Sequence, residues 1–162
     1  MKKILKKVMA TAMTVTILST NLISVPVNVS ASTTDRKIDF SVPAWSWKNP
    51  TKPYTKDTNS SVYFYLKSGS ASVLVRTHGC TLDSKSKYSW NKNLTLNKNG
   101  ESVSYVICNI GTEYEIYNEI NETGYLYAGI KMKSKGFSDN HVAGAWSPDF
   151  SRESGHTYKV AN

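Results

Sequence analysis

The chain has 162 residues, 40% of them hydrophobic and 20% charged, with a formal net charge of +8. Four lysines lie within the first seven positions, and the remaining chain has 16 basic against 12 acidic residues, a net charge near +4. This balance argues against a nucleic-acid-binding protein, but it favours anionic envelope polymers or lipid headgroups as partners.

The N-terminus has the three parts of a secretory signal peptide. The basic start precedes an uncharged, moderately apolar stretch at residues 8–25, and Val29-Ser30-Ala31 offers a small-residue cleavage site. Several Thr, Ser and Asn residues interrupt the apolar stretch, which argues against an uncleaved membrane anchor. We therefore predict a signal peptide over residues 1–31 and a secreted, extracellular mature chain.

Residues 32–61 are predicted to form a mostly extended polar segment rich in Trp and Pro. A first edge strand is expected near Val42, and the prolines that follow exclude a helix. Trp45 and Trp47 project their rings to the same side of an extended chain. With Tyr54, we expect them to bind a sugar ring or a lipid interface. The alternative is that both indoles fold back over an open end of the domain.

Residues 62–162 predict an antiparallel β domain that begins with two hairpins. Aromatic and β-branched residues at 62–66 and 71–76 flank a short Gly-containing loop, which indicates the first hairpin. Residues 81–90 are rich in Ser and Lys and predict a loop. A turn at Asn97-Lys98-Asn99-Gly100 then leads into the second hairpin, whose last strand covers residues 102–108.

The two cysteines, Cys80 and Cys108, predict one disulfide, because an even number of cysteines in an exported chain favours pairing. Closing this loop is worth ~3.5 kcal/mol in the chain-entropy model. The alternative pairs Cys80 with His78 as nucleophile and base, but the sequence supplies no clear third group to orient the imidazole.

Residues 111–124 fit two structures. Thr112 and Glu115 have the spacing of a helix capping box. Tyr114 and Ile116 alternate with glutamates as in a short strand. We predict a strand or turn here and keep one short helix as the alternative.

Residues 124–149 predict the hairpin around which the rest of the domain packs. Leu126, Ala128, Ile130 and Met132 alternate with polar or aromatic residues, as expected for a half-buried strand. A polar loop leads into a second strand, which ends in a turn at Pro148-Asp149. With a short closing strand at residues 157–160, the chain predicts an all-β fold: a single antiparallel β-sandwich, or a flattened barrel, of about eight short strands after the signal peptide.

Lys131, Lys133 and Lys135 lie on the polar side of the first of these strands. Three ammonium groups on one face predict contacts with the phosphates of a teichoic-acid-like polymer or with the headgroups of an anionic membrane. The alternative is that they protect the edge of a sheet from association.

The chain contains no recognisable catalytic motif, phosphate-binding loop or metal-ligand spacing. His141, Asp149, Glu153 and His156 are metal-ligand types, but their separations do not match a zinc site. We therefore predict no enzymatic activity, no cofactor and no metal.

The run YEIYNEINETGYLYAGIKMKS, followed by VAGAWSPDF, resembles the C-terminal half of a group of small, uncharacterised secreted proteins of Gram-positive bacteria that end in a G-x-W-S-P-D element. Gly144, Trp146, Ser147, Pro148 and Asp149 match that element. The resemblance implies a small exported β domain without a known activity. In physical terms Gly144 allows a neighbouring strand to approach, Trp146 fills the core, and Pro148 with Asp149 forms a tight turn.

Taken together, these patterns predict a secreted, non-enzymatic binding module for a cell-envelope or surface ligand, either a glycan or an anionic polymer. The alternative is a small bacteriocin-like antagonist that acts on target membranes.

Overall fold

The computed structural model describes residues 34–162. The signal peptide predicted at residues 1–31 lies outside the described residues. Within the described part there are ten strands and no helix, which confirms the all-β prediction. The strands are β1 (Arg36–Val42), β2 (Tyr54–Thr55), β3 (Val62–Ser68), β4 (Val73–Leu82), β5 (Tyr88–Asn93), β6 (Val106–Cys108), β7 (Thr112–Ile116), β8 (Tyr127–Ser134), β9 (Asn140–Ser147) and β10 (Tyr158–Val160).

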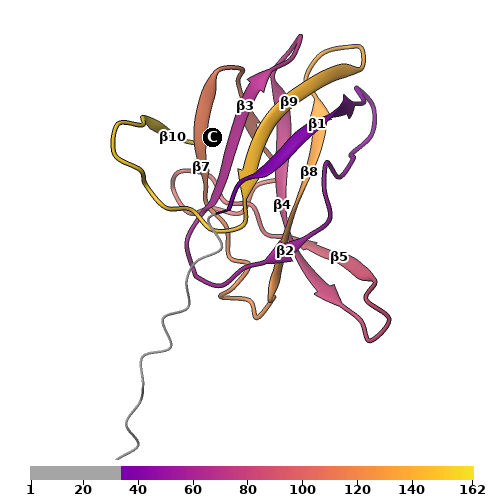
Figure 1. Ribbon diagram of the computed structural model, residues 1–162, viewed down its shortest axis with the longest axis vertical. Coiled ribbons are helices and arrows are strands. Elements are labelled where there is room, and N and C mark those ends of the chain that lie inside the picture. Colours follow the sequence, from indigo (N-terminus) through magenta and orange to yellow (C-terminus); the bar gives the residue numbers. More distant parts are fainter. Residues whose placement is uncertain (1–33) are drawn as a thin grey trace, which may run out of the picture.

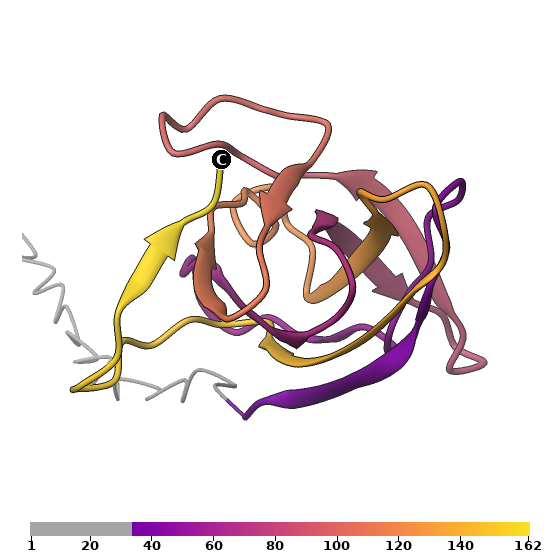
Figure 2. The same cartoon turned by 90° about the horizontal axis from the view of Figure 1, so that it is seen from above.

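The strands form two sheets that pack together as a sandwich (Figures 1 and 2). The first sheet has the order β1-β9-β3-β7-β10, and the second has the order β2-β8-β4-β5, with β6 also paired to β4. All pairs are antiparallel except β10 and β7, which run parallel. The β-sandwich prediction is therefore confirmed, with one parallel pair at an edge.

Two connections predicted as hairpins are crossovers between the sheets. β3 lies in the first sheet and β4 in the second, and β8 and β9 are divided in the same way. The buried side chain of Asn140 ties the two crossovers together: its Oδ1 accepts from the Ser70 N–H, and its Nδ2 donates to the Ala71 carbonyl, both at 2.7 Å. These two hairpin predictions were wrong because alternation shows which side chains face the core, not which strand lies alongside.

The core lies between the two sheets. Its largest fully buried apolar side chains include Phe64, Leu66, Ile130, Met132 and Trp146. At Gly144 a Cβ would collide with the carbonyl oxygen of Tyr65 on the neighbouring strand, so this position requires glycine. Trp146 and Gly144 thus take the places that the sequence predicted for them.

The predicted disulfide is not formed: Cys80 and Cys108 are both buried, free thiols. Cys108 lies opposite Val73 near the start of β4, whereas Cys80 lies seven residues further along that strand. Seven residues of extended chain span about 23 Å, far beyond the Cα separation that a disulfide tolerates. The even cysteine count indicated a pair, but the strand register separates the two thiols.

Two further stretches differ in how well the sequence predicted them. Residues 112–116 form β7, and the chain then turns at Gly124, so the strand prediction is confirmed and the helix alternative is not. Residues 81–90 were predicted as a loop, but only residues 83–87 form one; residues 81–82 extend β4 and residues 88–90 begin β5. In Figure 1 this β4–β5 hairpin projects from the body of the sandwich.

Candidate functional site

The W-S-P-D element anchors a loop through a buried ion pair. Lys56 Nζ lies 3.1 Å from Asp149 Oδ1, and both side chains are fully excluded from solvent. The ammonium also donates to the carbonyls of Ser60 and Pro148. The carboxylate accepts from the N–H groups of Asp57 and Thr58 and from the hydroxyls of Thr58 and Ser60. Every polar atom of this pair therefore has partners, as a buried charge requires.

The pKa values of this pair reflect burial and these partners. Burial alone would raise the pKa of Asp149, but the hydrogen bonds from Asp57 and Thr58 and the charge of Lys56 hold it below its usual value. Burial lowers the pKa of Lys56, and Asp149 opposes that shift. The element is thus structural. No local pattern around Lys56 indicates that it is the partner of Asp149.

The lysines predicted as ligand contacts lie on the outer side of the second sheet. Lys131 pairs with Arg76 and Lys133 with Leu74, while the intervening pair, Met132 and Val75, points into the core. Lys135 continues the ladder, since its N–H donates to the Ser72 carbonyl. Alternate residues of a strand lie about 6.7 Å apart, so the three lysines span about 13 Å.

These lysines do not protect a sheet edge. β8 has β4 on one side, while β2 and a bridge between Lys48 and Met132 flank the other. The alternative explanation for the three lysines therefore does not fit the sheet order.

Trp47 joins the lysines on this outer side. The Lys48 bridge places the indole next to β8, and the ring reaches across to β4, where the Arg76 guanidinium lies 3.8 Å from its centroid. Tyr105 packs beside it with a centroid separation of 6.4 Å. The Arg76 Nε donates to the Ser104 carbonyl at 2.7 Å, which fixes the guanidinium over the indole. We call Trp47, Arg76, Tyr105, Lys131, Lys133 and Lys135 the basic aromatic face.

A hollow of about 230 Å³ lies at one end of this face. Trp45 and Phe137 line it together with Tyr105, Lys133 and Lys135. The two aromatic rings come from separate loops and are strongly exposed, Trp45 at 77% and Phe137 at 92%. Five of the six residues predicted to bind ligand thus lie on this face or at its hollow.

Tyr54 is the exception. It pairs with Ala128, whose side chain is buried, and its ring packs against the core residue Trp146 at a centroid distance of 6.0 Å. The guanidinium of Arg36 lies 4.2 Å from its ring centroid. Tyr54 therefore faces the opposite side of the second sheet from Trp47.

The residues predicted to bind ligand did not include Arg76 and Tyr105, although the alternation of their own segments could have placed both side chains outward.

The basic aromatic face ends at a buried histidine. His78 lies on β4 next to Arg76 on the same side, and the indole of Trp90 covers it at a centroid distance of 6.2 Å. Trp90 also lies against β8, because a Cβ at Gly129 would sit 2.5 Å from its ring. Lys131 Nζ lies 5.5 Å from the Trp90 centroid. Burial first, then Lys131 and Arg76, lower the pKa of His78 to about 4.

Cys80 does not have the surroundings of a nucleophile. Burial raises the pKa of its thiol to about 12, and the thiol donates to the His78 backbone carbonyl rather than to the imidazole. An activated cysteine needs the opposite shift. The arrangement does not support the alternative in which His78 and Cys80 act as base and nucleophile.

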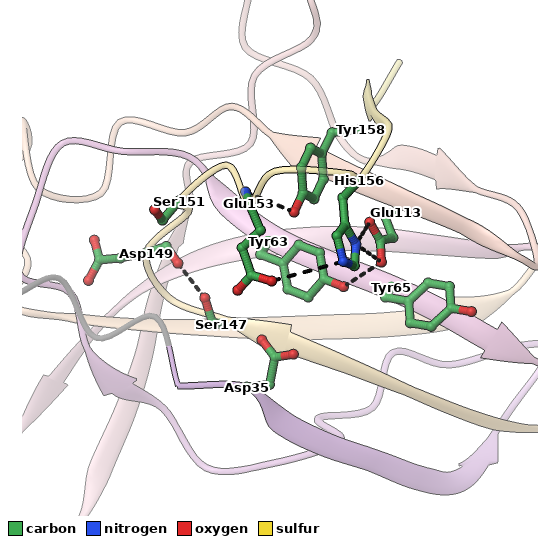
Figure 3. A pocket seen from close by; sticks show the side chains of 10 residues that line it. All are labelled: Asp35, Tyr63, Tyr65, Glu113, Ser147, Asp149, Ser151, Glu153, His156 and Tyr158. Carbon is green, nitrogen blue, oxygen red and sulfur yellow. Dashed lines mark hydrogen bonds and ion pairs between the residues drawn. The ribbon is translucent and has the colours of Figure 1, made fainter.

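A second hollow, of about 250 Å³, lies over the first sheet near the C-terminal strand (Figure 3). Glu113 is one of the residues that line it; its carboxylate lies 3.0 Å from His156 Nδ1 and accepts from the Tyr63 hydroxyl. The hydrogen bond from His156 to Glu113 raises the pKa of the imidazole. Burial, Glu153 and Glu113 raise the pKa of Asp35. This hollow is acidic and contains none of the predicted ligand-binding residues.

No group of three or more His, Cys, Asp or Glu side chains in residues 34–162 is arranged to hold a metal ion. In the same part of the chain, no helix has the length and apolar character needed to cross a membrane.

Comparison with known proteins places the chain in a family. No curated protein and no solved structure matches it. A family model matches residues 25–150, well over half of the chain, including β1 to β9 and the element at residues 144–149. The description of that family assigns no activity. The chain therefore belongs to the family described as "Protein of unknown function (DUF2712)".

Proposed function

We propose that this protein is a secreted, non-enzymatic binding module of the Gram-positive cell envelope. Its ligand is an anionic glycan polymer of the teichoic-acid type, bound on the basic aromatic face. The observation that supports this proposal is the gathering of Trp47, Arg76, Lys131, Lys133 and Lys135 on one outer side of one sheet.

Each part of the face suits one part of such a polymer. An indole and a phenol that lie side by side offer apolar surface for a sugar or polyol unit. The lysines repeat about every 6.7 Å along β8, so a linear ligand with recurring phosphates can contact several of them together. Surface charges on one face also raise the rate at which a polyanion arrives.

The direct test is retention on purified teichoic acid, with peptidoglycan that lacks it as a second surface. Wild type should be retained by the teichoic acid, and Trp47→Ala and the double variant Lys133→Glu/Lys135→Glu should weaken retention at least tenfold. Lys67→Glu/Lys159→Glu is the matched control: both lysines are exposed on the first sheet, and the change in net charge is the same. If the two double variants lose retention on teichoic acid equally, the effect is due to net charge alone, and the proposal is contradicted.

A second candidate is an antagonist that acts on target membranes, favoured by the exposed rings of Trp45 and Phe137 beside Lys133 and Lys135. Aromatic rings flanked by lysines suit the interface of an anionic bilayer. Dye release from phosphatidylglycerol vesicles and growth inhibition should then depend on Phe137. Leu126→Ser is the control for Phe137→Ser, since Leu126 is also exposed, at 66%, just before the other end of β8. Intact vesicles and unaffected growth would remove this candidate.

A further inference from the structure

His78 is the least satisfied buried polar group next to the basic aromatic face. Only 6% of its surface is exposed, and neither ring nitrogen has a hydrogen-bond partner of normal geometry among the described residues. The backbone of Asn91 approaches closely enough to favour the charged form slightly. A buried imidazole without partners is costly, so its position calls for a functional explanation.

The indole of Trp90 packs over His78 from a strand at the edge of the second sheet. Trp90 belongs to β5, which pairs with β4 and stands at the edge of the second sheet among the strands of residues 34–162, and the indole is half-buried. Its position depends on contacts with His78, Gly129 and Lys131. A rotamer change would uncover the imidazole without breaking a hydrogen bond between strands.

The groups around His78 are those of an anion site. Lys131 from β8 and Arg76 from its own strand are the charged groups that face it, and both oppose its protonation. On β4 and β5 its other titratable or polar neighbours include the Cys80 thiol, the Asn91 backbone and Asn93, which lies opposite His78 in the strand pair. In the described part of the chain, no carboxylate is among the groups that act on its pKa. A phosphate bound between Lys131 and Arg76 would reverse this balance and favour the imidazolium.

We propose that His78 is a concealed anion-binding residue, which Trp90 uncovers so that its protonated ring contacts a phosphate of the ligand. This inference rests on the proposed function and extends it. The imidazole takes one proton from solvent on binding, so acid strengthens the complex. The structure supports the inference through three features: an unpartnered ring, a covering indole on an edge strand and two flanking cations.

The size of the effect follows from proton linkage. The pKa of His78 is about 4 in the free protein, and the solvated, phosphate-paired ring should reach at least the ordinary value of 6.5. Affinity should then rise about tenfold between pH 7.5 and pH 5.5. The probe is unsubstituted poly(glycerol phosphate), whose phosphodiesters stay ionised over this range, so the pH effect belongs to the protein.

The chain's three histidines allow a matched comparison. His78→Gln should lose the tenfold rise, while His141→Gln and His156→Gln should keep it, because these two rings are exposed and pair with Asp39 and Glu113. An equal rise in His78→Gln would overturn the inference and leave the proposed function intact. No binding at either pH would overturn both.

Titration of the free protein tests whether His78 is concealed when no ligand is bound. The NMR titration of the His78 ring should have its midpoint near pH 4, and protonation should bring the Trp90 indole into solvent, as seen by quenching. His78→Gln should remove that change in quenching. A His78 midpoint near 6.5 without ligand would show that the ring is already solvated and would refute the concealed site, whatever the binding assays show.

Discussion

Lys56 Nζ and Asp149 Oδ1 lie 3.1 Å apart with neither side chain exposed, so the W-S-P-D element and the loop at residues 56–60 are held as one unit. The pair joins a residue just after β2 to one just after β9, and it connects segments that lie far apart in the chain. Loss of this ion pair should therefore lower the stability of the whole sandwich.

Asp149→Ala should lower the free energy of unfolding by ~3–5 kcal/mol, because it leaves the Lys56 ammonium buried without its counter-charge. Lys56→Met should cost less, since the Asp149 carboxylate keeps its hydrogen bonds from Asp57, Thr58 and Ser60. Denaturant unfolding measures both. Asp39→Asn is the control, because its ion pair with Lys37 is exposed. A small change in Asp149→Ala would show that the pair is not structural.

Acid should weaken the protein through the same carboxylate. The pKa of Asp149 is held below its ordinary value of 3.8 in the folded state, so its contribution is complete above about pH 4. It is lost as the pH falls through the lower folded pKa. Unfolding measured between pH 2 and pH 7 should show this acid loss in wild type and a flatter profile in Asp149→Asn, which lacks the titrating group. Parallel profiles would assign the acid loss to other carboxylates.

Both cysteines should remain free thiols after purification in air. A thiol reagent should label neither in the native state, because both are buried and burial raises their pKa values, and should label both after unfolding. Reducing agent should leave the unfolding midpoint unchanged. A reagent that labels no thiol in the denatured chain until it is reduced would instead indicate a disulfide.

Gly144→Ala should destabilise the first sheet by ~2–3 kcal/mol, since its Cβ would collide with a backbone carbonyl oxygen that cannot move aside alone. Gly136→Ala is the matched control: its Cβ would lie 3.4 Å from the Ala71 Cβ, an ordinary contact. Thermal unfolding of the two variants checks the difference. Equal midpoints would mean that β3 and β9 can separate enough to admit a methyl group.

Alternation was enough to predict part of the site from the sequence. Ala128, Ile130 and Met132 are buried, as their spacing indicated, and the lysines between and beyond them therefore face outward. Leu126 was assigned to the same buried face, but it precedes the start of β8 and is 66% exposed. The same rule could have placed Arg76 outward. It could not predict that Trp47 lies over Arg76, because that contact depends on how the segment before β2 passes beside β8.

Other features depend on tertiary structure that no local pattern encodes. Lys56 lies in a polar stretch and looks exposed, yet partners from distant segments make it one of the most buried side chains. The cysteine count suggested a bond that the register of β4 and β6 forbids. The short loop after β3 resembled a hairpin turn, but Asn140 from the start of β9 directs it to the other sheet.

Because many consecutive strands lie in different sheets, strands that pair in one sheet are often synthesised far apart in time. β1 pairs along its whole length with β9, from Arg36 opposite Trp146 to Val42 opposite Asn140. Synthesis must pass residue 147 before the first strand finds its neighbour. Such distant pairing slows folding. The chain should therefore remain unfolded during synthesis until nearly all of it has left the ribosome. Folding should then take milliseconds to seconds.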